Sequence, residues 1–220
     1  MEAESPAAGR HRYYPRGSDE FSRVLAFSDG LFAIAMTLLV VGIEIPDLKD
    51  ADSVSELAEV LNNDLGPFVS FFVSFAVIGR YWVAHHEFFA RLKALDSGLI
   101  GLNLVYLALV AFLPFPTGLL GDYFDNPLSI VIYAVTVAAV SGMEVVLFRH
   151  AHRSGPMTRE LPEDVYRWGT MLSLTPVVSF GLSIPIAFVS TTLAVACWFL
   201  AIPFQVWANR RKPPRADEFF

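Results

Sequence analysis

The 220-residue sequence is 54% apolar and 17% charged, with a formal net charge of −6. This composition is too hydrophobic for an ordinary soluble domain and is typical of a protein that crosses a membrane several times. The single cysteine, Cys197, excludes an intrachain disulfide framework, and we expect no nucleic-acid partner.

The N-terminal segment differs from everything that follows it. Residues 1–17 are rich in proline, glycine and alanine and lack hydrophobic periodicity, which predicts a mobile tail. No apolar run precedes residue 23, so we expect no cleavable signal peptide. The first apolar segment would then direct its own insertion.

The first predicted span covers residues 24–45, close to the roughly 20 residues that a helix needs to cross a bilayer. Its only charge before Ile43 is Asp29. An ionisable residue inside a span is costly, which makes Asp29 a candidate functional residue. On a helical wheel, an aliphatic stripe lies about 140° away from Asp29, with Thr37 beside it. The stripe consists of Ile34, Leu38, Val41 and Ile45.

Five further spans follow a polar segment at residues 47–64, which contains a possible short helix. The predicted spans are 65–89, 97–121, 127–148, 169–187 and 190–208, the last two drawn from an uncharged run of 42 residues. A Leu113-Pro-Phe-Pro-Thr117 sequence breaks the third span. Residues 18–209 thus form one all-α membrane domain, and residues 210–220 form a second tail.

Positive charges collect on one side of this topology. They lie in the two tails, in the second-to-third connection and in the fourth-to-fifth connection: Arg10, Arg12, Arg16, Arg23, Arg91, Lys93, Arg149, Arg153, Arg159, Arg167, Arg210, Arg211, Lys212 and Arg215. On the other side there is one cation, Lys49, among many acidic residues. Cytoplasmic loops are enriched in Lys and Arg, so we predict that both termini are cytoplasmic.

The first span also carries a recognisable motif. Arg23, then Phe27-Ser28-Asp29, then Gly-Leu-Phe-Ala-Ile-Ala-Met-Thr-Leu-Leu, resembles the first span of the prokaryotic relatives of the lysosomal potassium channel, the transmembrane protein 175 family. Weaker likenesses follow at Tyr81-Trp82-Val-Ala-His85-His86, at Asn103 and at the Leu113–Thr117 break. The last two spans carry little that is distinctive.

The resemblance implies a potassium-preferring channel in the bacterial inner membrane, built as a homotetramer around a pore that the first span lines. It implies the main constriction at Ile34, further layers at Leu38 and Val41, and a polar pore position at Thr37. The chain contains no Thr-Val-Gly-Tyr-Gly filter, so such a channel must select potassium with side chains. Two accounts of that selection compete: a tight apolar ring penalises potassium less than sodium because potassium is less strongly hydrated, or a ring of threonine hydroxyls supplies replacement oxygens.

A second group of polar residues is expected in the cytoplasmic half of the membrane. Asp29, Trp82, His85 and Asn103 lie at matching depths on the first three spans, and a buried carboxylate needs donors. The family resemblance implies that Arg23, Phe27, Ser28 and Asp29 hold the pore helix in place. We expect structural or gating roles for all seven residues.

Metal and catalytic sites are not expected. His85 and His86 are adjacent, so on a helix they point about 100° apart and do not chelate one ion together. No nucleophile, zinc-protease or phosphate-binding motif occurs. We therefore predict a protein that is not an enzyme, has no cofactor, and has potassium, lipid and its own copies as partners.

Two other classes stay open at this point. A secondary transporter would use inverted repeats and paired broken helices; neither is evident, although Pro176 and Pro185 interrupt the predicted fifth span. A membrane enzyme would need convergent titratable groups, and the cluster around Asp29 and His85 is the one candidate.

Overall fold

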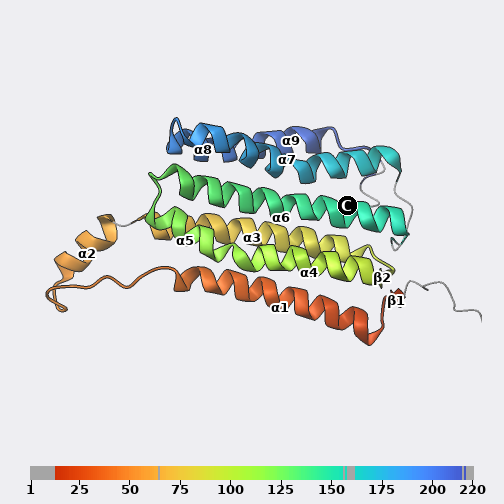
Figure 1. Cartoon of the computed structure of the whole chain (residues 1–220), viewed down its shortest axis with the longest axis horizontal. Coiled ribbons are helices and arrows are strands. Elements are labelled where there is room, and N and C mark those ends of the chain that lie inside the picture. The colour runs from red at the N-terminus through yellow and green to blue at the C-terminus, as the bar shows by residue number, and fades with distance from the viewer. Residues whose placement is uncertain (1–12, 64, 156, 158–161, 215, 217–220) are drawn as a thin grey trace, which may run out of the picture.

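The computed structural model describes residues 13–63, 65–155, 157, 162–214 and 216. These residues form two short strands and nine helices (Figure 1). Four single helices and two pairs of consecutive helices make six segments that are long and apolar enough to span a membrane. The elements are β1 (Tyr13–Pro15), α1 (Asp19–Val41), α2 (Val54–Asn63), α3 (Gly66–Ala90), β2 (Ala94–Asp96), α4 (Ser97–Phe112), α5 (Pro114–Asp122), α6 (Pro127–Ser154), α7 (Glu163–Ala187), α8 (Thr191–Trp198) and α9 (Ala201–Arg210). The predicted all-α fold with six spans is confirmed.

Side-chain caps explain where several helices begin. Ser18 accepts a hydrogen bond from the backbone of Phe21 at 3.2 Å, and α1 therefore starts five residues before the predicted residue 24. Asp96 caps α4 in the same way, through the backbone N–H of Leu99 at 2.6 Å. Asn126 caps α6, whose first residue is a proline.

Prolines act differently in two of the spans. The third span is divided at Leu113 into α4 and α5, because Pro114 lacks the N–H that would continue the helix. In contrast, α7 runs through Pro176 and Pro185 as one helix and starts at Glu163, before the predicted residue 169. The sixth span consists of α8 and α9.

The N-terminal segment is not entirely a free tail. Tyr13–Pro15 pair antiparallel with Ala94–Asp96, the connection between the second and third spans. The expectation of a mobile tail over residues 1–17 is wrong for this strand. The strand is held by backbone hydrogen bonds, which leave no hydrophobic pattern in the sequence. Residues 1–12, with Arg10 and Arg12, and the cations Arg159 and Arg215 lie outside the described residues.

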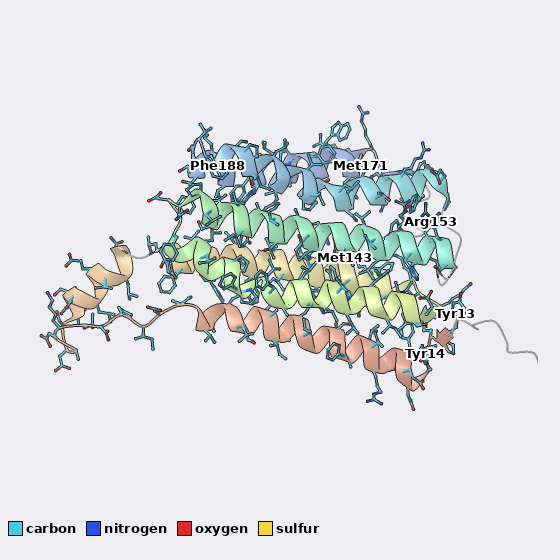
Figure 2. All side chains as sticks on the ribbon, in the orientation of Figure 1. Tyr13, Tyr14, Met143, Arg153, Met171 and Phe188 are labelled. Carbon is cyan, nitrogen blue, oxygen red and sulfur yellow. The ribbon has the colours of Figure 1, made fainter. Side chains whose placement is uncertain are left out.

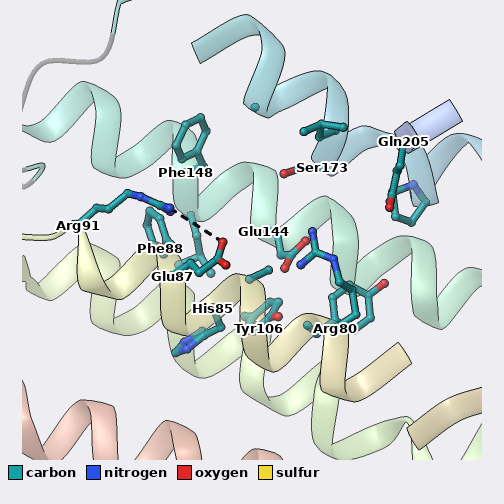
Figure 3. Close-up of a pocket in the computed structure, with 16 residues that line it drawn as sticks. Arg80, His85, Glu87, Phe88, Arg91, Tyr106, Glu144, Phe148, Ser173 and Gln205 are labelled. Atoms are coloured by element: carbon teal, nitrogen blue, oxygen red, sulfur yellow. Dashed lines mark ion pairs between the residues drawn. The ribbon is translucent and has the colours of Figure 1, made fainter. Parts of the chain in front are cut away.

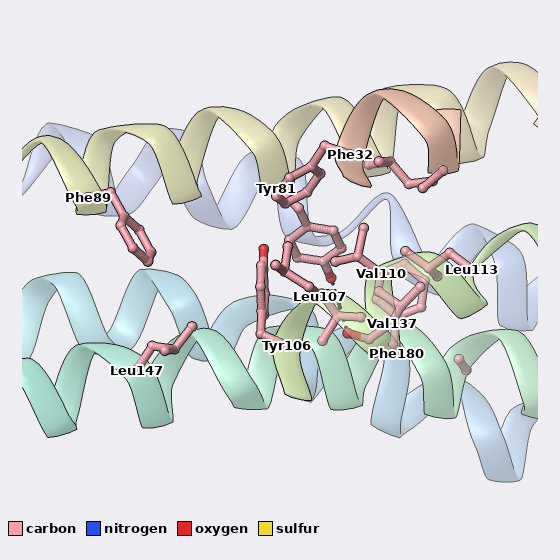
Figure 4. Close-up of a cluster of buried hydrophobic side chains, with 14 of the residues drawn as sticks. Phe32, Tyr81, Phe89, Tyr106, Leu107, Val110, Leu113, Val137, Leu147 and Phe180 are labelled. Atoms are coloured by element: carbon pink, nitrogen blue, oxygen red, sulfur yellow. Dashed lines mark hydrogen bonds between the residues drawn. The ribbon is translucent and has the colours of Figure 1, made fainter. Parts of the chain in front are cut away.

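The spans form layers across the bundle. In Figure 1, α1 lies at one edge, α3, α4 and α5 come next, α6 follows, and α7, α8 and α9 form the opposite edge. The buried core, which includes Phe32, Tyr106, Leu107 and Val110, fills the space between these layers (Figure 4). Helices α3 and α5 approach closely at Gly66, where an added Cβ would lie 2.4 Å from the carbonyl oxygen of Gly121.

Candidate pore helix and its anchoring network

Helix α1 has one face inside the subunit and one face outside it. Its buried residues are Phe21, Ser28, Phe32, Ala35 and Leu39, which pack toward α3, α4 and α5. On the other side Ile34, Leu38 and Val41 are 60%, 45% and 74% exposed. Side chains on this side of α1 project away from the rest of the bundle (Figure 2).

Thr37 lies on the exposed side with the aliphatic stripe. Its hydroxyl donates a hydrogen bond to the backbone carbonyl of Ile34 at 2.9 Å. The proton is therefore used within the helix, while the lone pairs of the hydroxyl oxygen stay available to a further donor or a cation.

A buried hydrogen-bond chain attaches the inner face of α1 to α4 and α3. The Ser28 hydroxyl donates to the carbonyl of Val24 at 2.9 Å and accepts from Asn103 Nδ2 at 3.0 Å. Asn103 Oδ1 in turn lies 2.9 Å from His85 Nε2. Since Oδ1 is an acceptor, His85 carries its proton on Nε2, and all three side chains are buried.

Asp29 is held by a separate contact. Trp82 Nε1 donates to Asp29 Oδ1 at 2.9 Å, which joins α1 to the same turn of α3 that carries His85. The sequence placed the indole, the histidine and the amide together as possible donors to this carboxylate. In the structure the indole donates to the carboxylate, whereas the Asn103 amide donates to Ser28 and His85 bonds to Asn103.

Aromatic packing orients the His85 ring. It stacks on Phe89 at a centroid distance of 4.2 Å and on Tyr106 at 5.7 Å, and Phe32 of α1 lies 5.4 Å away. Tyr106 and Phe32 were not identified from the sequence, since a lone aromatic in an apolar span gives no signal that distinguishes it from lipid-facing neighbours.

Arg23 and Phe27 lie apart from this network. Both line a shallow pocket between α1 and α4, together with Val24, Ile100, Asn103 and Leu104. Phe27 is 54% exposed. Of the seven predicted anchoring residues, the structure joins Ser28, Asp29, Trp82, His85 and Asn103 by hydrogen bonds within one subunit and leaves Arg23 and Phe27 at its surface.

Comparison with known proteins gives relatives that are named as ion channels. A family model described as the endosomal/lysosomal potassium channel TMEM175 matches residues 23–114. A potassium channel from Chamaesiphon minutus is 36% identical over 203 residues, covering 86% of this chain and 96% of that protein. A potassium channel from Streptomyces collinus is 32% identical over 183 residues, covering 81% of this chain and 87% of that protein.

A solved structure agrees with the sequence comparison. The crystal structure of a TMEM175 homologue from Chamaesiphon minutus, described as a lysosomal potassium-selective channel homologue, superposes with a TM-score of 0.68 at 33% sequence identity. The superposition covers 87% of this chain and all of the other chain.

The buried chain generates a stability prediction. In Asn103→Leu, the His85 N–H loses its acceptor inside the membrane domain, and an unpaired buried polar group costs about 1–3 kcal/mol. We expect the melting temperature of the purified protein to fall by several degrees, measured by the loss of the assembled species on heating. The control, Asn209→Leu at an exposed position of α9, should melt like the wild type. Equal melting of both variants and the wild type would contradict the role of the network.

Proposed function

Because the chain belongs to the TMEM175 family of potassium channels, we propose that it forms a potassium-preferring pore lined by α1, with an apolar side-chain constriction. Its relatives are named ion channels, not enzymes. The observation that carries the proposal is the two-faced character of α1. One face is fixed to α4 by a buried hydrogen bond and to α3 by an exposed one, and the other presents an aliphatic stripe outside the subunit.

The pore requires several copies of the chain. A single helix at the edge of a bundle does not enclose a path for ions, and the Phe-Ser-Asp motif occurs once in the sequence. We infer a homotetramer, in keeping with the family resemblance, in which four α1 helices meet at a central axis. The exposed apolar side chains of α1 then gain partners from neighbouring copies instead of lipid.

Ile34 is the proposed constriction. It lies near the middle of α1, and a ring of branched aliphatic side chains narrow enough to dewet blocks a hydrated ion. Leu38 and Val41, one and two turns further on, extend the apolar lining. Small outward movements of α1 would widen the ring and admit water, so the ring would act as a gate.

Thr37 is the proposed source of potassium preference. The sequence contains no carbonyl filter of the Thr-Val-Gly-Tyr-Gly type, so replacement oxygens must come from side chains. The Thr37 hydroxyl donates a hydrogen bond to the Ile34 carbonyl, so the lone pairs of the hydroxyl oxygen stay free. This supports a role for that oxygen as a ligand for permeating cations next to the constriction.

The distribution of charge along the bundle supports one orientation in a bacterial inner membrane. The positively charged connections and β1–β2 lie at one end of the bundle, and the acidic α2 segment projects from the other (Figure 1). By the excess of Lys and Arg, the first end is the cytoplasmic one. The acidic end would raise the local concentration of cations at the outer mouth.

A transporter mechanism has less support. Alternating access commonly uses pairs of discontinuous helices around a central site. Pro176 and Pro185 are the features that suggested such a break in the fifth span, and α7 continues through both. The third and sixth spans are divided instead, into α4 and α5 and into α8 and α9.

Ile34→Ala tests the constriction. Shortening this side chain widens the proposed ring, so we expect potassium flux through purified protein in liposomes to rise severalfold, while the preference over sodium falls. Val178→Ala, on the outer side of α7, makes a similar truncation at an exposed position and should leave flux unchanged. If the two variants behave alike as folded oligomers, the stripe serves packing only.

Thr37→Val tests the source of selectivity. The substitution keeps the shape and removes the hydroxyl, so we expect the potassium-to-sodium flux ratio to fall severalfold with total flux retained. The matched control is Thr136→Val in α6, which removes a hydroxyl bonded in the same manner to its own helix, at the carbonyl of Ile132. An unchanged ratio in Thr37→Val would assign selectivity to the apolar ring instead.

A further inference from the structure

A second polar site lies inside the subunit, away from α1. A cavity of about 150 Å³ is enclosed by α3, α4, α6, α7 and α9. Its polar wall is formed by Arg80, Tyr106, Glu144, Ser173 and Gln205, and apolar side chains, including those of Phe88 and Phe148, complete it (Figure 3).

Two polar atoms on this wall have only each other as a polar partner among the described residues. The Tyr106 hydroxyl and Glu144 Oε1 are both buried and interact with one another, and neither forms a hydrogen bond with a further described group. Tyr106 is completely inaccessible. A carboxylate accepts several hydrogen bonds, and one tyrosine hydroxyl leaves most of these positions unfilled. Because buried polar groups are nearly always satisfied by protein or water, Glu144 points to an occupant of the cavity.

The opposite wall adds further hydrogen-bonding capacity. Pro176 has no N–H, and the carbonyl of Leu172 one turn earlier therefore loses its helical partner. Leu172, Ser173 and Pro176 all line the cavity. Gln205 contributes an amide from α9. The wall thus offers both donors and acceptors, which suits water better than an ion of either sign.

The size of the cavity agrees with this occupant. A water molecule occupies about 30 Å³ in the liquid, so a cavity of about 150 Å³ accommodates several molecules. On α3 the lining runs from Arg80 to Arg91, or about 16 Å at ~1.5 Å per residue. It therefore extends from mid-span to the basic end of the bundle, where Arg91 and Glu87 form an ion pair at 3.9 Å.

We propose that this cavity is a water-filled chamber open toward the basic end of the bundle, and that Glu144 is a proton-binding site within it. Protons arrive along the water molecules and bind to the buried Glu144 carboxylate. The site is separate from the α1 stripe and does not depend on the proposed pore.

Several charged or titratable groups surround this carboxylate. Helix α3 and its C-cap contribute Arg80, Tyr81, His85, Glu87 and Arg91, and α4 contributes Tyr106; the lining residues of α7 and α9 are neutral. Arg80 interacts electrostatically with Glu144 without a direct ion pair between them. Because His85 shares the wall, the chamber also borders the network that anchors α1.

Infrared spectroscopy tests proton binding directly. In difference spectra between acidic and alkaline samples of the oligomer in liposomes, we expect a protonated-carboxyl band at the high frequency of a weakly solvated site. The band should disappear in Glu144→Gln, remain in Glu87→Gln at the cavity rim, and shift in Glu144→Asp, which keeps a carboxyl. A spectrum that Glu144→Gln leaves unchanged would overturn the proposal.

Cysteine labelling tests the water. In a Cys197→Ala background, Ser173→Cys should react with a small, positively charged methanethiosulfonate reagent in intact liposomes, because the reaction needs a solvated thiolate. Val178→Cys, exposed on the outer side of the same helix, should react far more slowly in lipid. Equal or slower labelling at position 173 would show a dry cavity and overturn the chamber.

Discussion

The structure depends above all on the burial of the Ser28 hydroxyl against Asn103 and His85. Hydrogen bonds between membrane helices contribute only about 0.6 kcal/mol on average, so these hydrogen bonds add little net stability to the fold. Leaving one of its buried groups unpaired costs more, about 1–3 kcal/mol. The main effect is therefore on geometry: any rotation of α1 that withdraws Ser28 from Asn103 is penalised. With Ser28 inward, Ile34 lies about 120° around the helix and Thr37 lies opposite, outside the subunit.

Helix α3 connects α1 to the rest of the bundle. Trp82 and His85 contact α1 and α4 from one side of α3, while the Tyr81 hydroxyl bonds to Ser141 of α6 at 2.6 Å and to the carbonyl of Val137 at 3.1 Å. A displacement of α1 that breaks neither set of bonds must carry α3 with it. Any movement of α1 in the proposed gate would thus involve the hydrogen bonds between α3 and α6, not α1 alone.

Periodicity and charge predicted the parts of the fold that follow from burial in lipid. The sequence was enough to predict six spans, the aliphatic stripe and a polar cluster around Asp29. Long uncharged runs and a carboxylate inside a span are unusual, so each of them is a clear signal. The pairing of Tyr13–Pro15 with Ala94–Asp96 could not be predicted, because a strand of three residues is too short to show a hydrophobic alternation. The partner of Asn103 was also predicted wrongly: the amide was expected to donate to Asp29 and donates to Ser28 instead. The two residues lie at nearly the same depth, and their side chains differ only in direction around the helix axis. Glu144 lies inside the predicted fourth span, residues 127–148, but was not singled out, because it stands near the end of that span after a long uncharged run.

The central claim is that the exposed faces of several α1 helices meet around one axis. Disulfide formation measures this directly, because it requires Cβ atoms about 3.5–4.5 Å apart and the only native cysteine, Cys197, can be removed. In a Cys197→Ala background, mild oxidation of Ile34→Cys in membranes should give covalent dimers, whereas Val178→Cys should stay monomeric. If Ile34→Cys instead reacts with thiol reagents but never crosslinks, neighbouring α1 helices do not meet at Ile34, and the pore described here does not exist.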